Sequence, residues 1–439
     1  MFIALIMFQT IVISIAGYVH FALGGPCPEK YHGSLKCYYY TYRTTDDPSN
    51  RQIKRVYLKK PWVTFDDIPD NCSYSCIMSD IKGDIDILGH PGSGTYLIIE
   101  RVIQAMSNKN AINMLEKNQI QVFHIETDKI VEIKRIGHRY QNRIQSRFRI
   151  HLPFNTNITI ESAGGDNHIR KIRGQIELRT RGGDIELEQL SGTISAYTDG
   201  GNINANHSDG VLDLHTSGGN IHITQSRGIV NAFNSAGDLN IVELKGNIKA
   251  IISGGNINIG SIEGDTISVQ INGGNLTART LNSNLIGRIN SGQISLKNIR
   301  GNISVGTSSG DIELENIYGN TICNTSIGGI HGKNIFGAIK AFTSSGNIEV
   351  EKAYDSSMKD HTIDLETSAG EITIVVPDGL PITIDAEAMD MQSPYAITSY
   401  IPMEVKILPD RIHGVGKIKN GIVQCSIKSS NGPITIKKN

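Results

Sequence analysis

The sequence predicts an all-β fold, a single-stranded parallel β-solenoid with 18-residue coils, each made of two nine-residue strand-and-corner units. The first observation is a glycine that recurs every 18 residues, with one step of 19: Gly165, Gly183, Gly201, Gly219, Gly237, Gly255, Gly274, Gly292, Gly310, Gly328 and Gly346. The second is a further set of glycines halfway between these, from Gly174 to Gly337. The third is the alternation of apolar and polar residues after each glycine, as in Ile185, Glu186 and Leu187, because a period of two is typical of strands.

The corners alternate in chemistry. One kind carries an inward Leu or Ile two residues before its glycine, as at Leu190 and Ile262, and the other is rich in Ser, Thr and Gly, as in "TSGG" and "TSSGD". Glycine supplies the positive φ that a tight corner needs. Equivalent positions are expected to stack at about 4.8 Å per coil.

The residue after the corner glycine is polar in nearly every coil, and we expect these residues to form a structural ladder. Its members are Asp184, Asn202, Asn220, Asp238, Asn256, Asn275 and Asp311. Asx side chains hydrogen-bond turn backbone, and stacked amides bond from rung to rung, so we expect them inward or buried at the corner. Calcium binding is the alternative, but the G-G-x-G-x-D pattern that it requires is absent. The sequence predicts no cofactor and no metal.

Before the repeat, residues 1–24 predict a signal peptide or an N-terminal anchor, since "MFIALIMFQTIVISIAGYVHFAL" contains no charge. The segment 25–71 contains cysteines, and residues 72–160 are expected to form irregular lead-in β coils with an insertion that includes a helix in "NKNAINMLEKNQ". The regular solenoid is predicted for 161–376. Closing coils, which cover the open end, are predicted for 377–439.

Four cysteines crowd before residue 77: Cys27, Cys37, Cys72 and Cys76. With the uncharged leader they predict two disulfides in an exported protein. A zinc site is the alternative, although "CPEKYHGSLKC" and "CSYSC" match no standard finger spacing. Cys323 and Cys425 are expected to be buried free thiols. Sequons at Asn71, Asn157, Asn206, Asn275, Asn302 and Asn324 predict a glycoprotein if a eukaryotic cell exports the chain.

The charge balance argues against nucleic acid as the main partner, because 42 basic and 43 acidic residues leave a net charge of −1 without a basic block. Catalysis is not predicted either. Acids and histidines such as Glu186, His222 and His331 are scattered along an outward rank, and no His or Asp repeats in register with the corner serines.

One outward rank is a candidate contact strip: Tyr197, His215, Phe233 and Ile251, on four successive coils. By period two these side chains face solvent, and an apolar strip on a monomer is a candidate contact surface. Two alternatives stand beside this interpretation. The N-terminal segment or the insertion covers the strip, or the strand has already turned there and the side chains fill the core beside Ala196, Ala232 and Ala250.

Several corners carry a family resemblance. "TSSGDIEL" (307–314), "TSAGEITI" (367–374), "SSNGPITI" (429–436) and "LPFNTNITIESAGGD" (152–166) resemble the putative adhesin domain family, a domain of unknown function found in bacteria and in some animal proteins. The resemblance covers about residues 72–439. It implies a β-helical, exported protein. The family has no established catalytic residues, so the resemblance implies none here, and fold alone does not give function.

These observations predict a secreted or cell-surface β-solenoid scaffold for binding or adhesion, without catalytic activity. Its expected partner is an extracellular protein or a glycan. Contact with a membrane is expected only through an uncleaved N-terminal anchor. The alternative function is a carbohydrate-active enzyme on the same β-helix fold, which a dense Asp/Glu/Arg cluster in an outer groove would favour.

Overall fold

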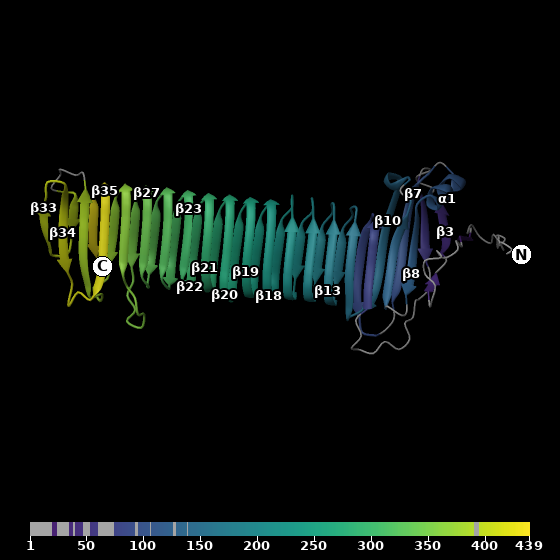
Figure 1. The fold of residues 1–439 in the computed structure, drawn as a ribbon, viewed down its shortest axis with the longest axis horizontal. Coiled ribbons are helices and arrows are strands. Elements are labelled where there is room, and N and C mark those ends of the chain that lie inside the picture. Colours follow the sequence, from purple (N-terminus) through teal and green to yellow (C-terminus); the bar gives the residue numbers. More distant parts are fainter. Residues whose placement is uncertain are drawn as a thin grey trace, which may run out of the picture. The chain divides into compact units, whose positions relative to one another are not determined.

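The computed structural model describes residues 20–23, 35–37, 40–46, 53–59, 74–92, 95–105, 107–125, 129–137, 139–389 and 395–439. The chain divides into two compact units, Met1–His215 and Thr216–Asn439. The division falls inside the segment predicted as regular solenoid. Both units consist almost entirely of strands (Figure 1).

The first unit begins with antiparallel strands: β1 (His20–Leu23), β2 (Leu35–Cys37), β3 (Tyr40–Asp46) and β4 (Ile53–Lys59). The lead-in strands follow: β5 (Tyr74–Ile81), β6 (Asp84–His90), β7 (Tyr96–Gln104), β8 (Gln119–Ile125), β9 (Ile130–Ile136) and β10 (Ile144–Pro153). β4 pairs antiparallel with β7, whereas β10 pairs parallel with β6. Parallel and antiparallel pairing are therefore mixed in this part.

The insertion contains the expected helix, α1 (Asn108–Glu116). It begins after Ser107, whose hydroxyl accepts a hydrogen bond from the backbone N–H of Asn110 at 3.2 Å. This bond satisfies one of the free N–H groups of the first turn. A single 3₁₀ turn, η1 (Gln141–Arg143), precedes β10.

The stacked parallel strands of the first unit are β11 (Thr156–Ser162), β12 (Asn167–Arg170), β13 (Arg173–Thr180), β14 (Ile185–Glu188), β15 (Ser191–Thr198), β16 (Ile203–Asn206) and β17 (Asp209–Thr216). Partners lie 18 residues apart, as Ile185 and Ile203 show. Strands that neighbour each other in the stack are therefore one coil apart in sequence.

The same register continues in the second unit, whose stacked strands are β18 (Ile221–Ala236), β19 (Leu239–Gly254), β20 (Ile257–Gly273), β21 (Leu276–Ser291), β22 (Ile294–Arg300), β23 (Ile303–Ser309), β24 (Ile312–Tyr318), β25 (Thr321–Ile327), β26 (Ile330–Ile335), β27 (Ile339–Ser345), β28 (Ile348–Lys352), β29 (Ile363–Ala369) and β30 (Ile372–Val376). Ile312 pairs with Ile330. The predicted parallel β-solenoid class is confirmed.

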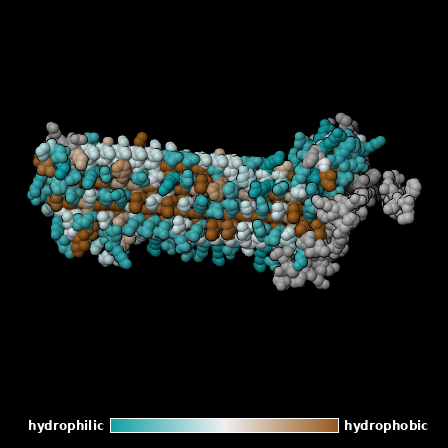
Figure 2. Space-filling view, viewed as in Figure 1, coloured by the Kyte–Doolittle hydropathy of each residue, from teal (hydrophilic) through white to brown (hydrophobic). Residues whose placement is uncertain are grey.

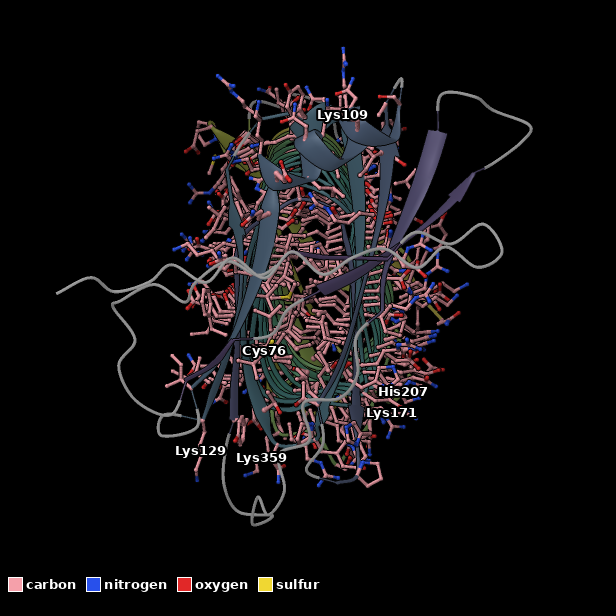
Figure 3. All side chains as sticks on the ribbon, turned by 90° about the vertical axis from the view of Figure 1, so that its right-hand side faces the viewer. Cys76, Lys109, Lys129, Lys171, His207 and Lys359 are labelled. Atoms are coloured by element: carbon pink, nitrogen blue, oxygen red, sulfur yellow. The ribbon has the colours of Figure 1, made fainter. Side chains whose placement is uncertain are left out.

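The core follows from the alternation of side chains. In β18, Ile221 and Ile223 are buried while His222 between them is half-buried on the outer side. Figure 3 shows side chains filling the space between the strand walls and others projecting outward. The buried set is mainly Ile, Leu, Val and Ala, because these residues fit a pleated surface that is buried on one face.

The two corners achieve their bends differently. At the Ser/Thr-rich corner a Cβ on Gly310 would collide with the carbonyl oxygen of Gly292 in the coil before, so only glycine fits. At the other corner the bend falls on the residue before the inward Leu or Ile. This residue has φ between 48° and 58° at ten successive positions, from Lys171 to Asn334, and none of them is glycine. Figure 3 labels Lys171 and His207 at this corner.

The C-terminal segment forms β31 (Ile382–Met389), β32 (Ile397–Ser399), β33 (Met403–Ile407), β34 (Arg411–Lys417), β35 (Val423–Asn431) and β36 (Ile434–Lys438). β35 pairs parallel with β29 on one side and with β31 on the other. β34 then pairs antiparallel with both β31 and β33. The strand that comes later in sequence therefore lies between two earlier ones.

The cysteines require one correction. Cys323 and Cys425 are free and buried, as predicted, but Cys76 is also free and only 1 % exposed. Its predicted disulfide is wrong, because the alternation of β5 places Cys76 inward with Tyr74 and Met78. Burial raises the pKa of the Cys76 thiol to about 12. Cys27 and Cys72 lie outside the described residues, as does most of the predicted leader, and of Cys37 only the backbone is described.

A search of the described residues finds no helix with both the length and the apolar character needed to cross a membrane.

Candidate functional site

The ladder residues bind backbone from coil to coil. The side-chain oxygen of Asp184 accepts from the N–H of Asn202 at 2.7 Å, and that of Asp311 accepts from the N–H of Gly329 at 2.8 Å. The same bond is made by Asn220, Asp238, Asn256 and Asn275. Their side chains, and that of Asn202, are half-buried or exposed, in contrast to the inward position expected. These oxygens satisfy corner N–H groups and so act structurally.

The contact strip lies on the outer side of its strands. In the first unit Tyr197 is 39 % exposed, and its ring centroid lies 6.0 Å from that of His215. In the second unit Phe233 pairs in register with Ile251, and both are half-buried. The adjacent inward positions are filled by Ala196, Ala232 and Ala250, which are buried.

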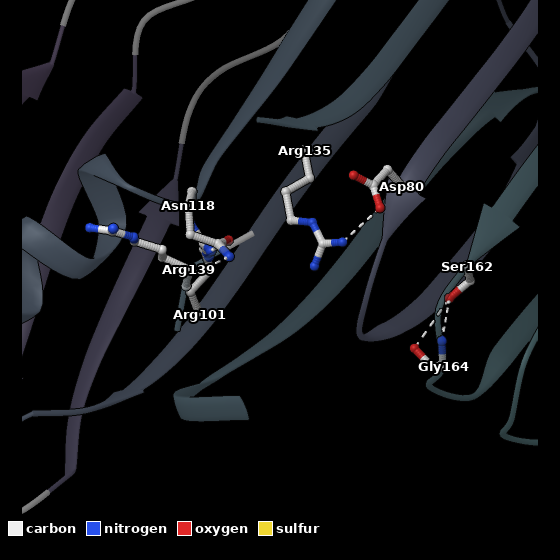
Figure 4. Close-up of polar contacts among 7 residues, drawn as sticks. All are labelled: Asp80, Arg101, Asn118, Arg135, Arg139, Ser162 and Gly164. Carbon is white, nitrogen blue, oxygen red and sulfur yellow. Dashed lines mark hydrogen bonds and ion pairs between the residues drawn. The ribbon is translucent and has the colours of Figure 1, made fainter. Parts of the chain in front are cut away.

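A groove of about 680 Å³ in the first unit includes Tyr197 in its wall. Its buried member is Arg135, which is 7 % exposed and whose Nη2 lies 2.7 Å from Asp80 Oδ1 (Figure 4). Its Nε is buried without a hydrogen-bond partner among the described residues. Arg179 and Arg181 face this groove together with Glu161 and Asp199. Three cationic and three acidic groups balance, so the groove favours neither sign of ligand charge.

A second groove, of about 710 Å³, lies in the second unit along the corner of positive φ. Its floor includes Ile262 and Leu281, each 2 % exposed. One wall is a rank of hydroxyl and amide side chains: Ser261, Thr280, Asn298 and Asn316. The opposite wall is the rank two residues further along each coil: Glu263, Asn282, Arg300 and Tyr318. We call it the Tyr318 groove.

The amides of the first wall form a row. Asn316 Nδ2 donates to Asn298 Oδ1 at 2.8 Å, and Asn334 Nδ2 donates to Asn316 Oδ1 at 2.8 Å. The row fixes each amide plane, so the remaining donors and acceptors point in repeated directions. Asparagine also tolerates the positive φ of this corner better than most residues.

Tyr318 is held between two neighbours. Its ring stacks on Phe336 with centroids 4.2 Å apart and planes 11° apart, and the Arg300 guanidinium carbon lies 5.6 Å from its centroid. The ring is nevertheless 40 % exposed. The Tyr318 groove therefore combines a fixed aromatic ring, a cation and a row of neutral polar groups. Space-filling atoms show apolar patches among polar residues over the strands of this unit (Figure 2).

This groove is absent from the sequence-based predictions. The signal was present in "NIR" (298–300), "NIY" (316–318) and "NIF" (334–336), which recur at 18 residues. Each triplet holds the amide, the inward Ile and the outward residue of one coil. The apolar rank of Tyr197 drew attention to the other outer face.

The described residues contain one close group of acids and a histidine: Asp385, Glu387 and His413. His413 Nε2 lies 2.8 Å from Asp385 Oδ1, and the Arg411 side chain lies 3.7 Å from Glu387. The arginine supplies the positive charge that a metal would bring, so this group is an ion-pair cluster. On the outward rank, His168 pairs with Glu186 at 3.6 Å and His331 with Glu349 at 3.7 Å, each one coil away.

Comparison with known proteins gives a family for the C-terminal half. Residues 257–437 match the model of the Toastrack DUF4097 family, which confirms the resemblance to an adhesin domain of unknown function over that part of the chain. No curated protein matches the chain.

Two solved structures are similar to it. A putative cell adhesion protein from Clostridium sporogenes is 10 % identical over 84 % of this chain and 93 % of its own, with a TM-score of 0.14. A putative adhesin from Bacteroides fragilis is 13 % identical over 72 % of this chain and 97 % of its own, with a TM-score of 0.17.

Proposed function

We propose that this chain is a non-catalytic β-solenoid scaffold of the cell surface or extracellular space, and that the Tyr318 groove binds an extended carbohydrate chain. The observation that carries the proposal is the fixed, exposed ring of Tyr318 beside a regular row of amides and hydroxyls. Export is supported by the uncharged leader of residues 1–24.

The chemistry of the groove fits sugars. The C–H face of a pyranose packs on the electron-rich face of an aromatic ring, and its hydroxyls both donate and accept hydrogen bonds. Tyr318 is already held by Phe336 and Arg300, so little ring freedom is lost on binding. The polar rank repeats at the strand spacing of about 4.8 Å, so successive residues of a linear glycan meet equivalent side chains. Many weak contacts then add along one ligand.

The same groove argues for binding over hydrolysis. Glycosidases usually place two carboxyl groups on either side of the scissile bond, about 5–9.5 Å apart. Among the residues that line the Tyr318 groove one is acidic, Glu263, and its carboxylate pairs with Lys245 at 2.9 Å. The groove thus lacks the second carboxylate of a hydrolase, and the carbohydrate-active enzyme remains the alternative.

The test is a glycan array with the purified full chain, followed by titration of the best oligosaccharide against Tyr318→Ala and Arg300→Ala. We expect Tyr318→Ala to weaken binding by about tenfold or more, as for an aromatic anchor. Tyr197→Ala is the matched control, since Tyr197 is 39 % exposed and Tyr318 is 40 % exposed.

Three outcomes would overturn parts of the proposal. An array without any bound glycan would reject the ligand class. Loss of binding in Tyr197→Ala, but not in Tyr318→Ala, would move the site to the contact strip. Release of shorter oligosaccharides during incubation would show that the protein is an enzyme.

A further inference from the structure

β33 is an edge strand of the C-terminal segment. It pairs antiparallel with β34 from Met403–Gly416 to Ile407–Ile412, and the described residues place no strand on its other side. An unpaired edge exposes backbone N–H and C=O groups that can pair with another strand.

The direction of these groups follows from the hairpin. Leu408 N–H donates to the carbonyl of Arg411 at 2.8 Å, which makes these two residues a hydrogen-bonded pair. Such pairs alternate along an antiparallel ladder, so Lys406 and Glu404 also bond to β34. The peptide groups of Met403, Val405 and Ile407 therefore point away from β34.

The side chains make this edge unusual. Val405 is 43 % exposed and Ile407 is 71 % exposed, although Ile412, opposite Ile407, is 1 % exposed. The apolar face of β33 continues a buried face and is left open at the strand edge. Glu404 and Lys406 lie on the opposite face, with Glu404 Oε1 3.0 Å from Lys406 Nζ.

We propose that β33 pairs antiparallel with β33 of a second copy of this chain, about a two-fold axis at Val405. In this register Glu404 faces Lys406 of the second copy, Lys406 faces its Glu404, and Met403 faces Ile407. The outward peptide groups allow two other registers of similar length. One sets Glu404 against Glu404 and the other sets Lys406 against Lys406, so both place like charges directly opposite each other.

The charge pattern of this strand is therefore complementary to itself in one antiparallel register, as an isologous two-fold interface requires. The pairing also covers Val405 and Ile407 with the same residues of the second copy. The edge is short, so the expected dimer is weak and depends on protein concentration. The proposal goes beyond carbohydrate binding and does not depend on it.

Sedimentation velocity over a concentration series, with reductant present, tests the proposal on the full chain. Wild type should show a reversible monomer–dimer equilibrium. Lys406→Glu and Glu404→Lys should each raise the dimer dissociation constant by about tenfold or more, because each sets like charges opposite each other. The double variant Glu404→Lys/Lys406→Glu restores complementarity and should return it to within about threefold of wild type.

Hydrogen exchange gives a second, independent measurement. The amides of Val405 and Ile407 should exchange more slowly at high protein concentration, whereas those of Glu404 and Lys406 should not change. A wild type that stays monomeric up to its solubility limit overturns the proposal. So does a dimer that the single charge reversals leave intact, or a double variant that fails to restore it while retaining the thermal midpoint of wild type.

Discussion

Lys352 is a buried charge at a position where the preceding coils have isoleucine. It pairs in register with Ile335, is 2 % exposed, and donates from Nζ to the carbonyls of Ile335 and Phe336 at 2.8 Å each and to that of Gly337. The three hydrogens of an ammonium thus meet three carbonyls. His361 Nδ1 also lies 3.0 Å from the Phe336 carbonyl. This polar cluster closes the corner where the chain departs into residues 353–362.

The first prediction follows from the burial of Lys352. Burial lowers its pKa to about 7, against the attraction of Asp360, whereas an unfolded lysine titrates near 10.4. Between about pH 7 and 10 the unfolded chain therefore binds more protons, and the free energy of unfolding rises with pH by up to about 1.4 kcal/mol per unit. Lys352→Met should remove this rise.

Urea unfolding at about pH 7, 8 and 9 checks it. The difference in unfolding free energy between wild type and Lys352→Met should grow in favour of wild type as the pH increases. Lys359→Met, in the same segment but at an exposed position, is the control and should show no such trend. A difference that stays constant from pH 7 to 9 would contradict the lowered pKa.

At the scale of the element, each coil is closed by a short set of side-chain bonds. In three successive coils a buried threonine at the Ser/Thr-rich corner donates to the carbonyl of the corner glycine of its own coil: Thr307 to Gly292, Thr325 to Gly310 and Thr343 to Gly328, at 2.9–3.1 Å. Ile252, Ile271 and Ile289 occupy the equivalent position in other coils and are buried there. Hydrogen bonding and apolar packing thus serve the same corner interchangeably.

The second prediction concerns the ladder between coils. Asn256 Oδ1 accepts from the N–H of Asn275 at 3.1 Å, and Asn256 Nδ2 donates to Asp238 Oδ1 at 3.2 Å. Asn256→Leu removes both bonds and should lower the free energy of unfolding by about 1–3 kcal/mol. Asn258→Leu, an exposed outward position two residues on, should change it by less than about 0.5 kcal/mol. Equal effects of the two substitutions, measured by urea unfolding, would refute the ladder's role.

At the scale of the whole chain, the cysteines report on both compact units. Cys76 lies in the first unit, and Cys323 and Cys425 lie in the second. Burial raises the pKa of all three thiols, to about 12 for Cys76 and Cys323. With Cys76 free, Cys27, Cys37 and Cys72 can form one disulfide among them instead of the two predicted.

The third prediction is a labelling pattern. An alkylating reagent should leave Cys76, Cys323 and Cys425 unmodified in the native protein, because they are buried and protonated. In denaturant without reductant all three should be modified, and peptide mass spectrometry identifies them. If Cys76 becomes reactive only after a reductant is added, it is disulfide-bonded, and the correction made from the structure is itself wrong.

The sequence by itself determined the fold class, because a period of two within each strand and a step of 18 between glycines are local patterns that only stacked coils satisfy. It also placed the ladder at the corner and Tyr197 on an outer face. Only the tertiary structure decided which outward residues become neighbours. Arg300, Tyr318 and Phe336 form one cluster because parallel pairing brings residues 18 apart into contact. It also decided the position of β35 between β29 and β31, since nothing local distinguishes the partner of a strand that returns over more than fifty residues.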